Sequence, residues 1–402
     1  MSIVIFGDLF TFPEGNAATN RVYTYAKGFL EQGTPVFVIC FENEYLKDYN
    51  GVIDGIYYYH PLERRCRSRF FIIRNWYKLL KFYNSVRLIR TIDKQDKITA
   101  INVWTDFFTT HVFAWFLKTI SRSKLIVERS EHPLAFFQKN QWIGALGLLK
   151  FKIETRLSDG ILCISKYLIE FHLNQGIDRG KLLLVPSTVD PTRFVNTGQR
   201  PFPTFYVGYF GGLTFDRDNI HILIEAFAKI SKSQPDVHLI LGGFCSDPER
   251  KRIFNLLEQL GISSRIIVLE YLTRAEIVNY IGHADILVMM RGNDLKSMAS
   301  FPSKLTEYLS TGKPVVTVDV GEIREYLTDC ENAFIVPPED AGQLGEKLDF
   351  IIKNYSIAEV VAGNGRALTQ GVFHYSFQAR RIINYISGMS RSSPAVKHSK
   401  NY

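Results

Sequence analysis

FPSKLTEYLSTGKPVV, residues 301–316, holds a helix start, a helix end and the start of a strand within sixteen residues. Pro302 suits the first helical turn, because it has no N–H to lose. The apolar spacing predicts a helix over Ser303–Ser310. Gly312 and Pro314 end this helix and lead into a strand. A short helix feeding a buried strand is typical of an α/β fold.

The start of this helix is suited to hold phosphate. Ser303 and Lys304 lie where free N–H groups and the helix dipole favour an anion, and Lys304 adds a positive charge. Glu307 lies four residues beyond Ser303, on the same face of the helix. Its carboxylate can accept hydrogen bonds from two vicinal hydroxyls, as on a ribose. An ordinary capped helix with a solvated Glu307 explains the same pattern, and the residues alone leave both interpretations open.

On both sides of this stretch, short apolar runs alternate with amphipathic segments along the chain. This alternation predicts parallel sheets flanked by helices. The first series of predicted strands is Ser2–Phe6, Val36–Phe41, Ile98–Trp104, Lys124–Glu128, Gly160–Ile164 and Leu182–Val185, with helices at Ala17–Glu31 and Phe107–Ile120. The second has strands Phe205–Phe210, Val237–Gly242, Arg265–Leu269, Asp285–Met290 and Pro314–Val318, with helices Asn219–Ile230, Pro248–Leu260, Arg274–Ile281 and Gln343–Ile352.

Between the two series, residues 186–203 hold four prolines and little periodicity, as in a linker. We expect two doubly wound α/β domains. The expected boundaries are 1–190 for the acceptor-side domain, 191–203 for the linker, 204–372 for the nucleotide-sugar domain, 373–390 for a helix packing back on the first domain and 391–402 for a disordered tail. Ligands of such folds bind at the carboxyl ends of the strands, which predicts a cleft between the domains.

The composition is that of a globular protein: 402 residues, 46% apolar and 22% charged. No apolar run reaches the length of a membrane span, and the chain begins directly with a predicted strand, so we expect a cytoplasmic protein. The five cysteines are scattered and form no CxxC pair. A disulfide scaffold or a zinc site is therefore not expected.

The net charge of +8 is concentrated between residues 61 and 90, with nine Lys or Arg and one acid. Basic and aromatic residues interleave over 64–90, and Phe136–Phe151 is a second aromatic and apolar stretch. This suits an anionic membrane surface. A basic solvent face over a core helix is the alternative. We expect no nucleic acid partner, because no recognition module is present.

FPSKLTEYLSTGKPVV closely resembles the stretch of family 4 glycosyltransferases, the "glycosyl transferases group 1" domain, that holds the nucleotide diphosphate. GYFGGLTFDRDNIHILIEAFAKI and LEYLTRAEIVNYIGHADILVMM are similar to other parts of that domain, and FPEGNAATNRVYTYAKGFLEQG to the glycine-rich loop and first helix of the preceding one. The resemblance covers most of residues 1–385. It implies the GT-B fold, with two facing Rossmann-like domains.

The resemblance also implies roles for individual residues. Glu307 matches the glutamate expected on the ribose, Ser303 and Lys304 the diphosphate contacts, and His132 the histidine near the transferred sugar. The implied donor-binding residues are Gly15, Asn16, Gly211, Gly212, Leu272, Ser303, Lys304, Leu305 and Glu307, and the implied catalytic residues are His132, Arg217 and Lys304. For His132, an ordinary loop histidine is the alternative.

Two positions depart from the family pattern. Ala299 stands where the first glutamate is usual, and Gly212 where an arginine is usual, with Arg217 in place of the following lysine. Arg217 can still neutralise a phosphate. These departures put the contacts to the sugar in doubt, whereas the nucleotide contacts match.

We expect no cofactor beyond the nucleotide-sugar donor, a UDP- or GDP-sugar, and no metal. Asp216-Arg217-Asp218 has the DxD spacing of some metal-dependent glycosyltransferases, but such a triplet is common by chance, and similar GT-B enzymes use basic groups instead.

The implied activity is a retaining, metal-independent transfer of a hexosyl or other glycosyl group to a glycan or lipid-linked acceptor, in the synthesis of a bacterial surface polysaccharide such as capsule, O-antigen or exopolysaccharide. The alternative is a GT-B sugar-nucleotide epimerase or a non-catalytic nucleotide-sugar-binding protein. An NAD-dependent oxidoreductase is disfavoured, because GDLFTFPEG and not GxGxxG follows the first strand.

Overall fold

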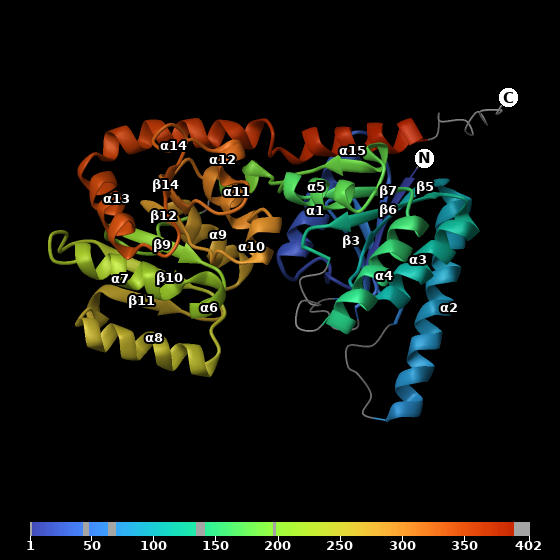
Figure 1. The fold of residues 1–402 in the computed structure, drawn as a ribbon, viewed down its shortest axis with the longest axis horizontal. Helices are drawn as coiled ribbons and strands as arrows, with labels where there is room; N and C mark the ends of the chain where they lie inside the picture. The colour runs from blue at the N-terminus through green and yellow to red at the C-terminus, as the bar shows by residue number, and fades with distance from the viewer. Residues whose placement is uncertain (1, 43–47, 63–69, 134–140, 196–197, 390–402) are drawn as a thin grey trace.

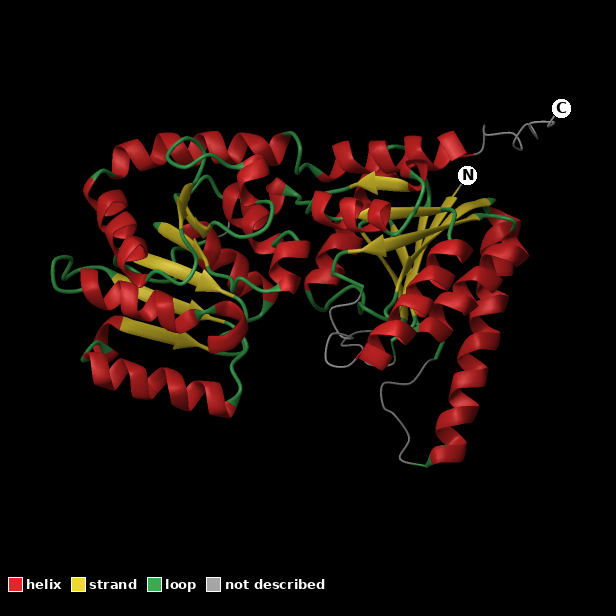
Figure 2. Ribbon diagram, viewed as in Figure 1, coloured by secondary structure: helices red, strands yellow, loops and turns green. Residues whose placement is uncertain are grey.

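The computed structural model describes residues 2–42, 48–62, 70–133, 141–195 and 198–389, and these form two α/β domains (Figure 1). The first sheet has the order β3-β4-β2-β1-β5-β6-β7-β8, and the second has the order β11-β10-β9-β12-β13-β14. All neighbouring strands run parallel except β3 and β4. Figure 2 shows the carboxyl ends of strands in both sheets directed toward the other domain.

The strands of the first sheet are β1 (Ser2–Gly7), β2 (Val36–Cys40), β3 (Asn50–Ile53), β4 (Ile56–Tyr59), β5 (Ile98–Trp104), β6 (Lys124–Arg129), β7 (Gly160–Cys163) and β8 (Leu182–Leu184). The helices up to the linker are α1 (Ala17–Glu31), α2 (Phe71–Gln95), α3 (Phe108–Ser121), α4 (Gln141–Leu157) and α5 (Lys166–Asn174), followed by the 3₁₀ turns η1 (Arg179–Lys181) and η2 (Pro191–Phe194).

The strands of the second sheet are β9 (Tyr206–Phe210), β10 (His238–Gly242), β11 (Ile266–Leu269), β12 (Ile286–Met289), β13 (Val315–Val318) and β14 (Phe334–Val336). The helices are α6 (Phe215–Asp218), α7 (Ile220–Ile230), α8 (Asp247–Leu260), α9 (Arg274–His283), α10 (Leu295–Ala299), α11 (Ser303–Ser310), α12 (Ile323–Tyr326), α13 (Ala341–Lys353), α14 (Tyr355–Gln370) and α15 (Tyr375–Met389), with the 3₁₀ turn η3 (Ser263–Arg265) after α8.

The central strands are buried on both faces, which is why they read as continuous apolar runs in the sequence. Every residue of β1, for example, is buried. Helices α1 and α15 cover one face of the first sheet, where Val22 and Phe29 pack with Ile382. Helices α2 and α3 contribute Ile89 and Leu117 to the core on the other face.

The strands and helices predicted from the apolar periodicity are confirmed, with shifts of one or two residues at their ends. The β3–β4 hairpin is not among them. Its turn is Asp54-Gly55, where both residues have positive φ (50° and 80°). Asp-Gly is a strong hairpin signal, but the apolar residues on either side are too few to stand out as strands.

The chain crosses between the domains at two adjacent points. Val189, in the segment before η2, accepts a backbone hydrogen bond from Tyr375 and donates one to Phe373 (3.2 and 3.0 Å). Helix α15 then lies along α1, where a Cβ on Gly28 would approach Ala379 Cβ to 2.6 Å. The segments expected as linker and as returning helix therefore lie beside each other at the junction of the domains (Figure 1).

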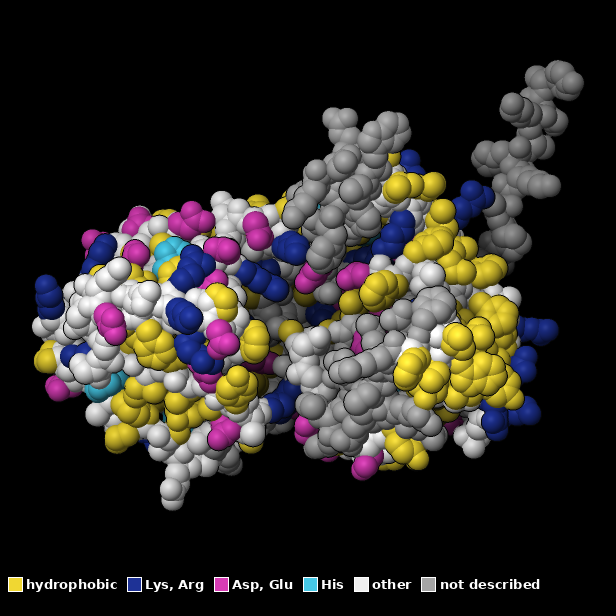
Figure 3. Space-filling view, turned by 90° about the horizontal axis from the view of Figure 1, so that it is seen from below, with side chains coloured by type: hydrophobic (Ala, Val, Ile, Leu, Met, Phe, Trp, Pro, Cys, Tyr) yellow, Lys and Arg dark blue, Asp and Glu magenta, His cyan; other side chains and the backbone are white. Residues whose placement is uncertain are grey.

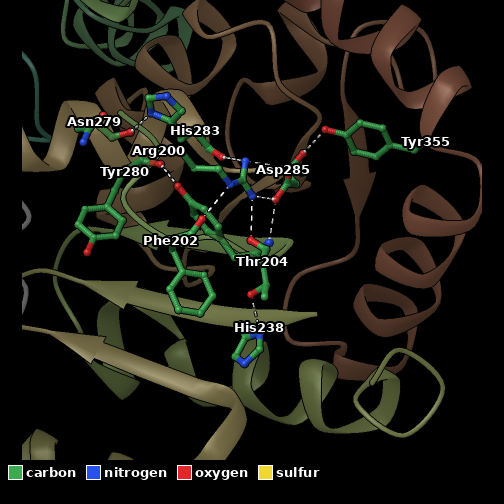
Figure 4. A network of polar contacts seen from close by, with 10 residues as sticks. Arg200, Phe202, Thr204, His238, Asn279, Tyr280, His283, Asp285 and Tyr355 are labelled. Carbon is green, nitrogen blue, oxygen red and sulfur yellow. Dashed lines mark hydrogen bonds and ion pairs between the residues drawn. The ribbon is translucent and has the colours of Figure 1, made fainter. Parts of the chain in front are cut away.

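Arg200 fixes the chain where it enters the second domain (Figure 4). Its guanidinium lies 2.5 Å from Asp285 and donates to the carbonyls of Thr204 and His283. Asp285 also accepts from the backbone N–H of Tyr206, the first residue of β9, at 2.8 Å. One ion pair thus joins the linker to the first and fourth strands of this domain.

Among the described helices, none is both long and apolar enough to span a bilayer. The tail expected at 391–402 lies outside the described residues, as do parts of the segments 64–90 and 136–151.

Candidate functional site

Helix α11 starts at the carboxyl edge of the second sheet, and its first N–H groups are open. Pro302 is the N-cap and supplies no side-chain hydrogen bond. The N–H of Leu305 donates to the Pro302 carbonyl at 3.2 Å. No acceptor among the described residues takes the N–H of Ser303 or Lys304. Two free N–H groups at the positive end of a helix dipole make a site for an anion.

The Lys304 side chain lies across the end of β9. Its Nζ is 3.0 Å from the hydroxyl of Tyr209 and 3.7 Å from Asp218. Burial lowers the pKa of Lys304, and the positive charges of Arg217 and Arg291 lower it further. The negative charge of Asp218 raises this pKa and so opposes them. Since three positive charges face one another here, an incoming anion would stabilise the group.

Gly211 makes this position of Lys304 possible. A Cβ on Gly211 would lie 1.7 Å from Lys304 Nζ. Gly243, at the end of the neighbouring strand β10, has φ of 140°, and a Cβ there would meet the carbonyl oxygen of Gly211 at 1.9 Å. These two glycines bring the ends of β9 and β10 close enough for Lys304 to lie directly over the backbone.

Glu307 faces the first domain. Asn20, on α1, donates a hydrogen bond to its carboxylate at 3.1 Å, across 287 positions of sequence. Burial raises the pKa of Glu307, and Arg193, Arg274 and Lys304 oppose that shift. The carboxylate therefore lies in a basic environment formed by η2 and the second domain, and the first domain contributes the amide of Asn20.

The sequence predictions did not include Asn20, Arg193 or Arg274. Burial lowers the pKa of Arg274 to about 10, and the nearby charge of Arg193 adds to the effect. Asn20 lies four residues after Asn16, so its place on the same face of α1 was a usable signal. Arg193 and Arg274 come from a linker turn and a helix start, whose proximity no local pattern reveals.

Gly15 and Asn16 form the start of α1, opposite α11. Asn16 is the N-cap, and its Oδ1 accepts from the N–H of Ala18 and of Thr19 at 3.0 and 3.2 Å. A Cβ on Gly15 would lie 2.4 Å from the hydroxyls of Thr11 and Thr19. Both residues thus shape a tight loop before the helix, and Gly15 leaves its backbone exposed.

His132 follows β6 and is buried beside α5. Its ring centroid lies 4.5 Å from that of Phe171 and 6.0 Å from that of Tyr167. Burial lowers the pKa of His132, so the imidazole is neutral near pH 7. It can exchange hydrogen bonds with hydroxyl groups but is not a source of positive charge.

Arg217 and Gly212 lie near Lys304 and Asp218, and Leu272 lies beside Gly242 at the end of β10. Arg217 is exposed on the short helix α6, and its carbonyl accepts from the N–H of Gly292 at 3.1 Å. A Cβ on Gly212 would approach the carboxylate of Asp218 to 2.8 Å. Leu272 is partly buried and packs at the end of β10.

Leu305 lies on the inner face of α11. Its side chain is fully buried in the core, and its N–H is already bonded to Pro302. Its side chain therefore contributes to packing in this structure, and the binding role expected for Leu305 stays a prediction. The apolar periodicity that marks α11 as amphipathic already placed this residue on the inner face.

Ala299 is buried against the first domain. Its carbonyl accepts from the hydroxyl of Ser165, the N-cap of α5, at 2.6 Å. Glu322 reaches the same helix start, accepting from the N–H of Tyr167 at 2.7 Å. The first turn of α5 therefore occupies the surroundings of Ala299.

No cluster of metal-ligating side chains occurs within the part of the chain that the structure describes. In the Asp216-Arg217-Asp218 triplet, Asp218 accepts from the hydroxyl of Thr214 at 2.8 Å and faces Lys304. Asp216 is exposed and lies 3.8 Å from Arg252. The two carboxylates thus face cations of the protein itself.

The sequence of this chain was compared with family models and with known proteins, and the matches agree with this architecture. The family model described as "Glycosyl transferases group 1" covers residues 203–368. An uncharacterised glycosyltransferase of Methanocaldococcus jannaschii is 23% identical over 55% of this chain and 57% of its own length. A trehalose synthase of Pyrococcus horikoshii is 24% identical over 54% and 56%. The chain thus spans about half the length of the curated relatives it matches.

Two solved structures cover nearly the whole chain. The sucrose-phosphate synthase of Thermosynechococcus elongatus aligns with a TM-score of 0.74 at 16% identity, over 98% of this chain and 100% of that one. The Anabaena protein HepE in complex with UDP aligns with a TM-score of 0.68 at 17% identity, over 96% and 100%. These likenesses establish the overall fold. The chain therefore has the GT-B fold, and its residues 203–368 match the family model of the glycosyl transferases group 1 domain.

Proposed function

We propose that this protein is a glycosyltransferase that moves a sugar from a nucleotide-sugar donor to a glycan or lipid-linked acceptor. The observation that carries the proposal is the start of α11. There the free N–H groups of Ser303 and Lys304 and the ammonium of Lys304 lie one helical turn from the carboxylate of Glu307. This spacing suits a diphosphate followed by a ribose.

The donor is a UDP- or GDP-sugar. HepE, which shares this fold, has been crystallised with UDP and with UDP-glucose, and this supports a uridine donor. In the proposed complex Glu307 accepts hydrogen bonds from the ribose hydroxyls, and Lys304 and Arg217 neutralise the diphosphate. Leu272 lies near the base, and the loop at Gly15 and Asn16 approaches the donor from the first domain.

The proposed reaction retains the anomeric configuration and needs no metal. The acceptor oxygen forms a bond to the anomeric carbon on the face from which the diphosphate leaves, and the bond from that carbon to the phosphate oxygen breaks. The acceptor hydroxyl gives its proton to the leaving diphosphate. Lys304, Arg217 and the α11 N-terminus stabilise the negative charge that develops on the leaving group, and neutral His132 positions the transferred sugar.

We place this reaction in the synthesis of a bacterial surface polysaccharide, with the enzyme in the cytoplasm or at the inner face of the membrane. An excess of positive charge in residues 64–90 supports an anionic membrane surface as a partner. We expect the transferred group to be a hexosyl group.

The alternative is an epimerase acting on the nucleotide sugar, or a protein that only binds it. The buried Ala299 favours this alternative, because the carboxylate common at this position is absent. A panel of UDP- and GDP-sugars separates the three functions. A transferase releases nucleoside diphosphate in step with acceptor glycosylation, an epimerase changes the sugar and releases none, and a binding protein does neither.

Replacement of Lys304 tests the proposed transferase directly. Lys304→Ala should lower kcat/KM about 10²-fold or more, because one preorganised positive charge on the leaving group is lost. Its side chain is partly exposed, so the melting temperature should stay close to that of the wild type. Lys313→Ala, just beyond the far end of the same helix, is the matched control and should keep full activity. Undiminished transfer by Lys304→Ala would remove the assignment.

A further inference from the structure

In the first half of helix α2, most of the side chains that the structure describes are exposed. The helix has 25 residues, so it is about 37 Å long. Its second half reaches the core through Ser85, Ile89 and Ile92, which are buried. Lys81 makes an attachment ahead of these residues, donating to the carbonyl of Phe41 at 2.6 Å. Before it, the helix extends away from the sheet (Figure 1).

The first half of α2 carries a stripe of exposed apolar side chains. Ile72, Trp76, Leu79 and Tyr83 are 81%, 63%, 62% and 60% exposed. Their spacing of four, three and four residues places them on one face of the helix. Ile73 and Leu80 are also exposed and widen the stripe. An apolar face of this width is normally buried against something.

A second exposed apolar stripe lies on α4, which contacts α3 as α2 does. Leu146, Leu149 and Ile153 are 66%, 56% and 37% exposed at helical spacing. In Figure 3 hydrophobic side chains gather on the first domain, Lys and Arg lie at the edge of that group, and the junction of the two domains crosses the same face.

The charge of residues 64–92 indicates what kind of partner binds the α2 stripe. No Asp or Glu occurs between residues 64 and 92. Lys78, Arg87 and Arg90 are exposed on α2 itself. A second copy of the chain would bring the same positive charge to the stripe and be repelled. An anionic bilayer attracts it, and Trp and Tyr side chains are favoured at the boundary between headgroups and acyl chains.

We propose that the first half of α2 is a membrane-docking helix that inserts the stripe of Ile72, Trp76, Leu79 and Tyr83 into the interface of an anionic bilayer. The basic side chains of the helix contact the lipid headgroups, and the α4 stripe adds a second apolar contact. The alternative of a basic solvent face over a core helix applies to the second half of α2 only. Docking holds the cleft close to the bilayer, where lipid-linked acceptors lie; this last step rests on the proposed transfer.

Flotation of the full chain with vesicles tests the docking. We expect binding to vesicles of 30% phosphatidylglycerol in phosphatidylcholine at moderate salt, weaker binding to pure phosphatidylcholine, and weakening as salt increases. The double variant Trp76→Ser/Leu79→Ser should bind the anionic vesicles about tenfold less tightly or worse, because both inserted side chains are lost. Ile357→Ser/Val360→Ser is the matched control. It removes two exposed apolar side chains from α14 of the other domain and should bind as the wild type does.

Other outcomes would overturn the proposal. The first is that the wild type does not bind anionic vesicles, and the second is that the α2 double variant binds them equally well. The third is that the wild type forms a concentration-dependent dimer, which the double variant abolishes, and does not bind vesicles. Circular dichroism checks that the variants fold. Nucleotide-sugar binding separates this proposal from the proposed function, since the α2 variant should keep it. Lys304→Ala should in turn keep flotation.

Discussion

At the scale of single residues, the site depends on the absence of side chains as much as on their presence. Gly211 allows Lys304 to cross the end of β9, and Gly243 allows β10 to approach Gly211. The two glycines differ in what a Cβ would meet. At Gly211 it meets the flexible end of a lysine, and at Gly243 it meets backbone at a φ that other residues rarely adopt.

This difference predicts opposite effects of the same substitution. Gly211→Ala should displace Lys304 and lower kcat/KM by about tenfold or more, while the free energy of unfolding changes by less than about 0.5 kcal/mol. Gly243→Ala should instead destabilise the protein by about 2 kcal/mol or more. Urea unfolding together with initial-rate kinetics measures both. A Gly211→Ala enzyme with wild-type rates would show that Lys304 does not need its observed position.

A buried histidine should make stability depend on pH. His111 is fully buried, with its Nε2 3.0 Å from the carbonyl of Glu154. Burial lowers the pKa of His111 to about 3. The unfolded chain therefore binds one more proton than the folded chain as the pH falls below about 6.5, and the folded state loses stability.

The contribution of His111 should amount to about 2 kcal/mol between pH 6.5 and pH 5. His111→Gln, which cannot take up this proton, should reduce the fall in unfolding free energy over that interval by up to the same amount. Denaturant titrations at the two pH values provide the measurement. An equal fall in the variant and the wild type would contradict the assignment to His111.

At the scale of elements, local sequence determined most of the helices and strands. The start of α1 shows why. Asn16 caps the helix with its own side chain, so helix and cap are specified by neighbouring residues. Hairpin β3–β4 was missed because its strands are short and partly exposed, although its Asp54-Gly55 turn was visible.

The cap of α1 gives a prediction that separates folding from binding. Asn16→Ala should cost about 1 kcal/mol of stability, because two N–H groups lose their acceptor. Asn16→Asp keeps the cap and loses only the hydrogen bond that Nδ2 of Asn16 donates to the carbonyl of Leu9 (3.1 Å), so it should lose no more than about 1 kcal/mol of stability. Its negative charge should nevertheless weaken donor binding if the loop faces the diphosphate as proposed. Thermal unfolding and titration with a nucleotide sugar test the two effects. Unchanged donor affinity in Asn16→Asp would place the diphosphate elsewhere.

At the scale of the whole molecule, contacts between the two domains converge on the start of α5. Ser165 donates to the carbonyl of Ala299, and the N–H of Tyr167 donates to Glu322. Burial raises the pKa of Glu322. This helix start belongs to the first domain, whereas Ala299 and Glu322 belong to the second, so the contacts join the two domains.

Loss of the Glu322 contact should loosen this helix start. Glu322→Ala should increase hydrogen exchange at the Tyr167 amide about tenfold, since a charged acceptor is lost. Glu325→Ala, which removes only the exposed ion pair with Lys166, is the control and should leave that amide unchanged. Hydrogen-exchange mass spectrometry of residues 165–170 provides the measurement. Equal protection in both variants would mean that Glu322 does not hold the helix start.

The sequence by itself determined the two alternating series of strands and helices, α11 among them, because these depend on residues a few positions apart. The tertiary structure decided which distant residues contact these elements. Asn20 reaches Glu307 across 287 positions, and the first turn of α5 surrounds Ala299. The apolar stripe of α2 is exposed, although the same spacing in α7 is buried in a core. Periodicity shows that a helix has an apolar face, but only packing between distant segments decides what covers it.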